Sequence, residues 1–299
     1  WMLAVERWAT SNPSIAAGSD QLYLGHRFVG IPRVRGPACE PLYFGSYLLA
    51  IAPVTAAAAW GSRGWSRLWR WITVGLAALA LVLTFSRGVY GAAVVVLLLL
   101  VWGLWRGRLP RPRLRVAGAG VVAMAVAVLV AASVFTGTEP WALPRLLADR
   151  VAQSFVGHDM SNLTRLYSWS VAVDLARQAP WSGVGWGGYG FHFFELAGPE
   201  ATGAHFGWPV PNNLPLQIMA ETGIPGLLLW GFALWPAVRS LVRRDPQVSA
   251  AEDAGRFLLA ALVVGMGVQA MTHSQLQLPH LWLVTGISSA LASSRFPLV

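Results

Sequence analysis

Two arginines have surroundings that suit the binding of an anion. Arg87 lies in the short turn Ser86-Arg87-Gly88 between two apolar segments, and Arg165 lies in the long polar interval 137–213. A guanidinium group keeps its charge and presents a planar fork of donors that matches phosphate oxygens. Anchoring at a membrane surface would also explain Arg87, and a solvated helix face would explain Arg165. The residues alone leave both alternatives open.

One acidic residue, Glu221, stands inside an apolar segment that begins near Leu214. A carboxylate inside a bilayer is costly unless it is paired or faces a wet cavity, so a functional role is the first expectation. A hydrogen bond between packed helices would explain it equally well. Gly223, Pro225 and Gly226 follow closely, and this pattern predicts a kink or a break in the helix.

Two further patterns suggest cofactor or metal chemistry but do not support it. Gly183 to Gly188 has the G-x-G-x-x-G spacing of dinucleotide-binding turns, which require a preceding strand. Here the pattern follows Pro180 in a polar interval, so we interpret it as a tight surface turn. His192 and Glu195 are only two candidate ligands, too few for a zinc site. We therefore predict no cofactor and no metal.

The composition predicts the architecture that must position these residues. Only 12% of the 299 residues are charged, about half of the usual 25% in soluble domains. Long apolar runs then predict an all-α, polytopic transmembrane bundle. About seven spans are expected, near 44–60, 71–85, 89–105, 116–135, 214–235, 257–272 and 281–292. The corresponding segments are 1–43 outside the membrane, 44–136 with four spans, the loop 137–213, and 214–299 with three spans.

The arginines predict how the bundle is oriented. Thirteen of the 22 lie in the loops 61–70, 106–115 and 236–256 and in the C-terminal tail. The positive-inside rule places these loops in the cytoplasm and the 137–213 loop outside. The net charge of +9 does not indicate a nucleic-acid partner, because the arginines lie in short loops between apolar segments. Membrane lipids are the expected surroundings.

Two helices are expected within the long loop. One is amphipathic, because its apolar residues recur at helical spacing: Leu146, Leu147, Val151 and Phe155. The other should begin after Ser161 or Asn162, which are good N-caps, and end near Gln178 before Pro180.

Three sequence blocks, taken together, resemble the O-antigen ligase and polymerase family of bacterial membrane glycosyltransferases. The first is Leu-Thr-Phe-Ser-Arg-Gly at 83–88. The second is Arg165-x-x-x-Trp169 with Pro-Trp-Ser-Gly-Val-Gly at 180–185. The third runs from Asn212-Asn213 to Gly226. A weaker fourth block covers 33–50. The resemblance extends from about residue 30 to the C-terminus and, with the chain starting at Trp1, leads us to expect further spans upstream.

The resemblance implies a C-type glycosyltransferase-like fold in the bacterial cytoplasmic membrane, with the large loop on the extracytoplasmic side. It implies an undecaprenyl-diphosphate-linked glycan as donor and a hydroxyl on a glycan or lipid-anchored acceptor, without a metal. Arg87 and Arg165 would bind the diphosphate, and Ser86 and Asn213 lie in the same motifs as further substrate-binding candidates.

The chain departs from the family at one position. Where the family has the histidine regarded as the base, this sequence has Asn212, and an amide does not take up a proton at neutral pH. Asn212 could still orient a hydroxyl, while His205 and Glu221 are the candidate replacements; a surface histidine is the plain alternative for His205. Polymerase activity and an inactive scaffold remain open. A transporter is less favoured because no internal repeat is visible.

Overall fold

The computed structural model describes residues 27–28, 31–34, 41–109, 142–152, 160–201, 209–274 and 279–293, with single positions between 126 and 139. Their regular secondary structure is helical apart from one small antiparallel ladder, in which β1 (Arg27–Phe28) pairs with β2 (Ile31–Pro32). The all-α prediction is therefore confirmed for this part of the chain.

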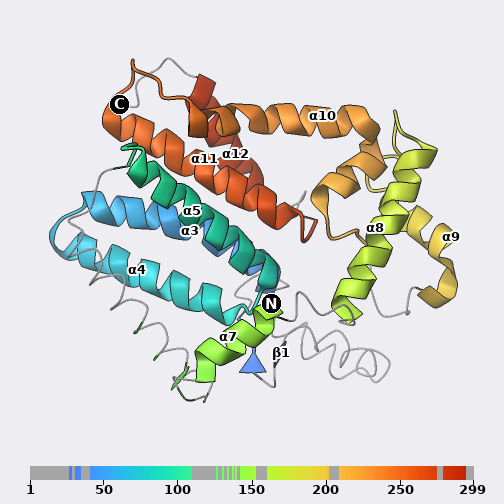
Figure 1. The fold of residues 1–299 in the computed structure, drawn as a ribbon, viewed down its shortest axis with the longest axis horizontal. Helices are drawn as coiled ribbons and strands as arrows, with labels where there is room; N and C mark the ends of the chain where they lie inside the picture. The colour runs from blue at the N-terminus through green and yellow to red at the C-terminus, as the bar shows by residue number, and fades with distance from the viewer. Residues whose placement is uncertain are drawn as a thin grey trace.

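Six helices lie side by side in a bundle (Figure 1): α3 (Pro41–Gly61), α4 (Gly64–Leu83), α5 (Arg87–Trp105), α10 (Leu214–Val242), α11 (Ala250–Ala270) and α12 (Pro279–Ser293). Their core is a buried cluster that includes Leu49, Val96, Leu214, Met266 and Leu281. Within the described ranges, four helices are long and apolar enough to cross a membrane, namely α3, α4, α5 and α10. Helices thus occupy six of the expected span positions, and the fourth expected span, 116–135, falls mostly outside the described residues.

Several helices begin earlier than the apolar runs suggested. α4 begins at Gly64 instead of near residue 71 and so includes Arg67 and Arg70. α5 begins at Arg87, so this arginine is a helical residue and not part of a three-residue turn. α11 begins at Ala250, and its N-cap is Ser249, whose side chain accepts a hydrogen bond from the Glu252 amide. Hydropathy finds the apolar part of a helix, whereas arginine is itself a good helix former that extends it.

Helix α10 is broken at Gly223, as its glycines and proline predicted. Gly223 has φ 71° and ψ −172°, outside the helical region. Pro225 has no amide hydrogen to bond the preceding turn. The carbonyls of Ala220 and Glu221 instead accept hydrogen bonds from a segment before α9, so the break leaves them satisfied.

The long loop contains three described helices: α7 (Ala142–Ala152), α8 (Met160–Gln178) and α9 (Tyr189–Ala201). Two loop helices were expected, and α7 and α8 lie at their positions; α9 was not expected. α8 begins at Met160, so Ser161 and Asn162 lie inside the helix and not at its N-cap. Phe155 of the first expected helix lies outside the described residues.

α8 and α9 pack together, with the first half of α10, around Val171, Leu175, Tyr189, Phe193 and Ala220. In Figure 1 this unit lies beside one end of the bundle. We call this end, at which α5 and α10 begin and α11 ends, the loop end.

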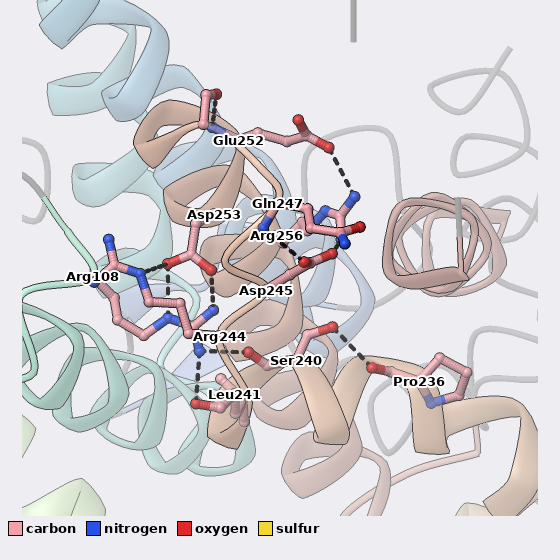
Figure 2. A network of polar contacts seen from close by, with 11 residues as sticks. Arg108, Pro236, Ser240, Leu241, Arg244, Asp245, Gln247, Glu252, Asp253 and Arg256 are labelled. Carbon is pink, nitrogen blue, oxygen red and sulfur yellow. Dashed lines mark hydrogen bonds and ion pairs between the residues drawn. The ribbon is translucent and has the colours of Figure 1, made fainter. Parts of the chain in front are cut away.

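A network of ion pairs lies at the other end of the bundle (Figure 2). Arg108, just after α5, donates to both carboxylate oxygens of Asp253 at 3.0 and 2.5 Å, and to the carbonyls of Ser240 and Leu241. The loop after α5 therefore contacts the end of α10 and the start of α11, segments that were expected on the same side of the membrane. We call this end the network end.

Candidate functional site

Three turns meet at the loop end of the bundle: residues 84–86 between α4 and α5, residues 209–213 before α10, and residues 271–274 after α11. The Asn213 side-chain amide donates to the Met271 carbonyl at 3.3 Å and joins the second turn to the third. Gly88 lies so close to Thr272 that an added Cβ would be 2.1 Å from its hydroxyl oxygen. This contact joins the first turn to the third.

The turn between α4 and α5 has a strained backbone. Phe85 is buried and has φ 46°, a value that a bulky residue adopts only when its surroundings enforce it. Arg33 donates to the Thr84 carbonyl at 2.7 Å, and the Val34 amide donates to the Leu83 carbonyl. The segment 33–34 therefore holds this turn from outside the bundle, directly before the buried Ser86 and the first residue of α5.

The turn before α10 contains the two asparagines of the third sequence block. Asn212 has φ 51°, a left-handed conformation that asparagine tolerates, and its amide lies 3.5 Å from the Val210 carbonyl. Asn213 is the N-cap of α10, because its side chain accepts from the Leu216 amide at 3.1 Å. Histidine is also enriched at positive φ, so the backbone at position 212 would accept the residue that the family has there.

The third turn contains a buried histidine, His273, that the sequence analysis did not single out. Nδ1 of His273 lies 3.0 Å from the Gln269 carbonyl. A carbonyl oxygen only accepts, so Nδ1 carries the proton, and Nε2 is the acceptor nitrogen of the neutral ring. Mainly through burial, the pKa of His273 is lowered to about 3; the hydrogen bond to the Gln269 carbonyl opposes this shift, and the charges of Arg165 and His280 contribute to it. The ring is therefore neutral at pH 7.

Both candidate arginines border this third turn. Arg165, on α8, is near enough for its charge to act on the His273 ring. Arg87 is the first residue of α5 and directly precedes Gly88, which packs on Thr272. Both side chains are partly exposed. The structure thus places at one end of the bundle two guanidinium groups that are 78 positions apart in the sequence.

More groups from α3 and α12 surround the histidine. The Tyr43 ring centroid lies 5.7 Å from that of His273, and Nε2 of His280 lies 3.0 Å from the Ser46 hydroxyl. The available signal in the sequence was a pair of histidines, 273 and 280, in a short connection between two apolar segments. The surroundings of this pair could not be inferred from the sequence, because they come from α3 and α8, which are distant in the chain.

A family model described as O-antigen ligase matches residues 72–231, just over half of the chain. The chain belongs to the O-antigen ligase family. All seven expected site residues lie within the match: Ser86, Arg87, Arg165, His205, Asn212, Asn213 and Glu221. Family membership and the four apolar helices identify the protein as a membrane protein, and the family indicates a glycosyltransferase-type activity in polysaccharide biosynthesis. No curated protein and no solved structure matches the chain.

Glu221, the acidic residue inside α10, makes packing contacts in this O-antigen ligase family member. Glu221 is buried, and its carboxylate accepts a hydrogen bond from the Gln217 side chain at 3.1 Å, one turn earlier in α10. Its backbone carbonyl accepts from the Gly185 amide at 3.0 Å. These contacts stabilise the broken helix, and a catalytic role for Glu221 stays a prediction. His205 lies outside the described residues.

The structure of this family member also describes the two patterns that suggested a dinucleotide or a metal in the sequence. The Gly183–Gly188 pattern follows a helix, α8, and not the strand that a dinucleotide site requires. His192 Nδ1 lies 2.8 Å from the Glu195 carboxylate, within the same helix. Among the described residues no group of three or more potential metal ligands comes together. Neither pattern offers a metal or a dinucleotide a set of ligands.

Proposed function

We propose that this protein transfers a glycan from an undecaprenyl-diphosphate donor to an acceptor hydroxyl at the outer face of the bacterial cytoplasmic membrane. The observation that supports this most directly is that Arg87 and Arg165 border the same turn at the loop end of the bundle, within the family's matched region. The arginine asymmetry of the loops supports placing that end outside the cytoplasm.

In the proposed reaction, Arg87 and Arg165 bind the diphosphate of the donor. The acceptor oxygen forms a bond to the anomeric carbon while the bond from that carbon to the phosphate oxygen breaks. The electron pair leaves with undecaprenyl diphosphate, and the two guanidinium groups stabilise the charge that develops there. Ser86, directly before Arg87, and Asn213, in the second turn, are the further substrate-binding residues.

The proton of the acceptor hydroxyl requires an acceptor other than Asn212. We assign it to His205, the nearest histidine before Asn212 in the sequence, because a neutral imidazole takes up a proton close to neutral pH. Asn212 orients the hydroxyl by hydrogen bonding. His205 and Glu221, the candidates from the sequence, are both tested by replacement with glutamine.

The arginine clamp is tested by replacing each guanidinium with a point charge. Arg87→Lys and Arg165→Lys should each lower transfer from a purified lipid-linked donor by about 100-fold or more, because lysine cannot bind two phosphate oxygens with a planar fork. Arg177→Lys is the matched control, since Arg177 lies on α8 with its side chain 76% exposed. Full activity in the Arg87→Lys variant would refute the clamp.

One observation favours a second candidate, a non-catalytic family member that serves as a scaffold: Asn212 replaces the family's histidine. Under this alternative the native protein transfers nothing, and Asn212→His creates activity that was absent before. Under our proposal the native protein is active and His205→Gln abolishes transfer. Supplying a lipid-anchored sugar acceptor and a second lipid-linked unit in parallel separates a ligase from a polymerase.

A further inference from the structure

The glycine- and tryptophan-rich turn before α9 carries two tryptophans that the proposed reaction does not use. Trp181 and Trp186 are 74% and 71% exposed, and Phe191 at the start of α9 is 66% exposed. An exposed indole is unusual in a segment whose backbone is firmly held, because a large apolar ring in water has a free-energy cost. The turn therefore presents an aromatic surface whose partner must be identified.

The backbone of this turn is fixed to the break in α10. The Ile224 amide donates to the Pro180 carbonyl at 2.8 Å, and the Val184 and Gly185 amides donate to the carbonyls of Ala220 and Glu221 at 2.9 and 3.0 Å. The two main chains touch, because a Cβ added at Gly223 would lie 2.7 Å from the Trp181 carbonyl carbon. Trp181 is thus held at a fixed height along α10.

That height is the point at which the apolar outer face of α10 begins. After the break, a row of exposed apolar side chains follows along the helix: Ile224, Leu228, Leu229, Phe232 and Trp235. Residues 224–242 form a helical segment about 28 Å long at 1.5 Å per residue, close to the thickness of a hydrocarbon core. The second half of α10 therefore suffices to cross the bilayer, and the break falls at its boundary.

Tryptophan has a strong preference for this boundary, where its ring is apolar and its N–H group can bond to headgroups or water. We propose that the turn 180–188 is a membrane-interface anchor, in which Trp181 and Trp186 insert into the headgroup region beside α10 and seat α8 and α9 on the lipid surface. The aromatic turn is bonded to α10 at the point where the exposed apolar row of that helix begins, which makes phospholipid the occupant. The inference depends on the membrane location of the protein and not on the proposed reaction.

Depth measurements on site-specific spin labels test the anchor. The native cysteine is removed by Cys39→Ser, and one label each is attached after Trp181→Cys or Trp186→Cys in vesicles of phosphatidylethanolamine and phosphatidylglycerol. Arg177→Cys, at an exposed position of α8, provides the aqueous reference. Phe232→Cys, at an exposed position of α10, provides the hydrocarbon reference. The measured quantity is the ratio of the label's collision rate with oxygen to its collision rate with a water-soluble nickel chelate, which rises with depth in the bilayer. At positions 181 and 186 this ratio should be several-fold higher than at position 177. It should also be lower there than at position 232.

A ratio at 181 and 186 equal to that at 177 would overturn the anchor. If a soluble oligosaccharide then restricted those aqueous labels, the aromatic surface would instead be a stacking platform for sugar. Because the readout is depth in the bilayer and needs no substrate, a protein without transferase activity would still give the expected ratios. Failure of the anchor and failure of the proposed function are therefore separate results.

Discussion

The buried ion pair at the network end allows a quantitative test of what holds the bundle together. Arg108 and Asp253 have side chains only 7% and 3% exposed, and the guanidinium donates to both carboxylate oxygens. Asp253→Ala removes these acceptors and leaves a buried positive charge with only the carbonyls of Ser240 and Leu241. Loss of one partner from a buried pair costs about 3–5 kcal/mol. Arg244, 3.7 Å from the carboxylate but largely exposed, adds little.

The measurement is the free energy of unfolding of the protein in mixed micelles, followed by circular dichroism as the fraction of denaturing detergent rises. The double variant Arg108→Met with Asp253→Ala should lose about 2–3 kcal/mol less than the sum of the single variants, because no buried charge is left alone. Asp174→Ala is the control, since it breaks an exposed pair with Arg177 worth about 0.5 kcal/mol or less. If Asp253→Ala costs no more than this control, the pair does not hold the loop after α5 to the start of α11.

Three further outcomes are expected from the loop end. Gly88→Ala forces a methyl group against the Thr272 hydroxyl and should lower the free energy of unfolding by about 1–3 kcal/mol; Thr272→Ala should restore part of the loss, and no loss at all would contradict the close approach. Gly183→Ala combines φ 65° with a Cβ only 2.2 Å from the Glu221 backbone, so it should cost about 2–5 kcal/mol and expose the turn to limited proteolysis, whereas intact protease resistance would argue against the contact. His273 has a folded pKa of about 3, which is below its unfolded value of about 6.5. Below pH 6.5 the unfolded chain therefore binds more protons at this position than the folded chain, and the free energy of unfolding falls as the pH falls. Between pH 7.5 and 5 the loss is about 2 kcal/mol. His273→Gln should remove this part of the pH dependence, and an unchanged slope would show that the ring is not buried in neutral form.

The sequence predicted those parts of the fold that depend on local pattern. Apolar runs located the membrane helices, and the glycines around Pro225 predicted the break in α10. Helix α9 was missed because its buried rings, Tyr189 and Phe193, acquire their meaning only by packing on α8. Its glycine-rich start also reads locally as a continuing turn. Periodicity cannot show a helix whose apolar face is defined by a partner in another part of the chain.

The candidate site was only partly accessible from the sequence for the same reason. Arg87 and Arg165 could be selected by their residue type and by the motifs around them. His273 could not, because its neutral state depends on burial and on the charge of Arg165, which lies more than a hundred positions earlier. The strained turn at Phe85 is likewise a consequence of tertiary contacts with Arg33 and Val34.

The attachment of the turn 180–188 to the break in α10 limits how the proposed lipid donor could reach the arginines. Three backbone hydrogen bonds close the seam between them, and in surroundings with little water each broken bond leaves groups that cost several kcal/mol. Under the proposed function, the polyprenyl chain of the donor therefore does not pass through this seam and approaches from another side of the bundle. In any rearrangement, α8, the turn and the first half of α10 must move together.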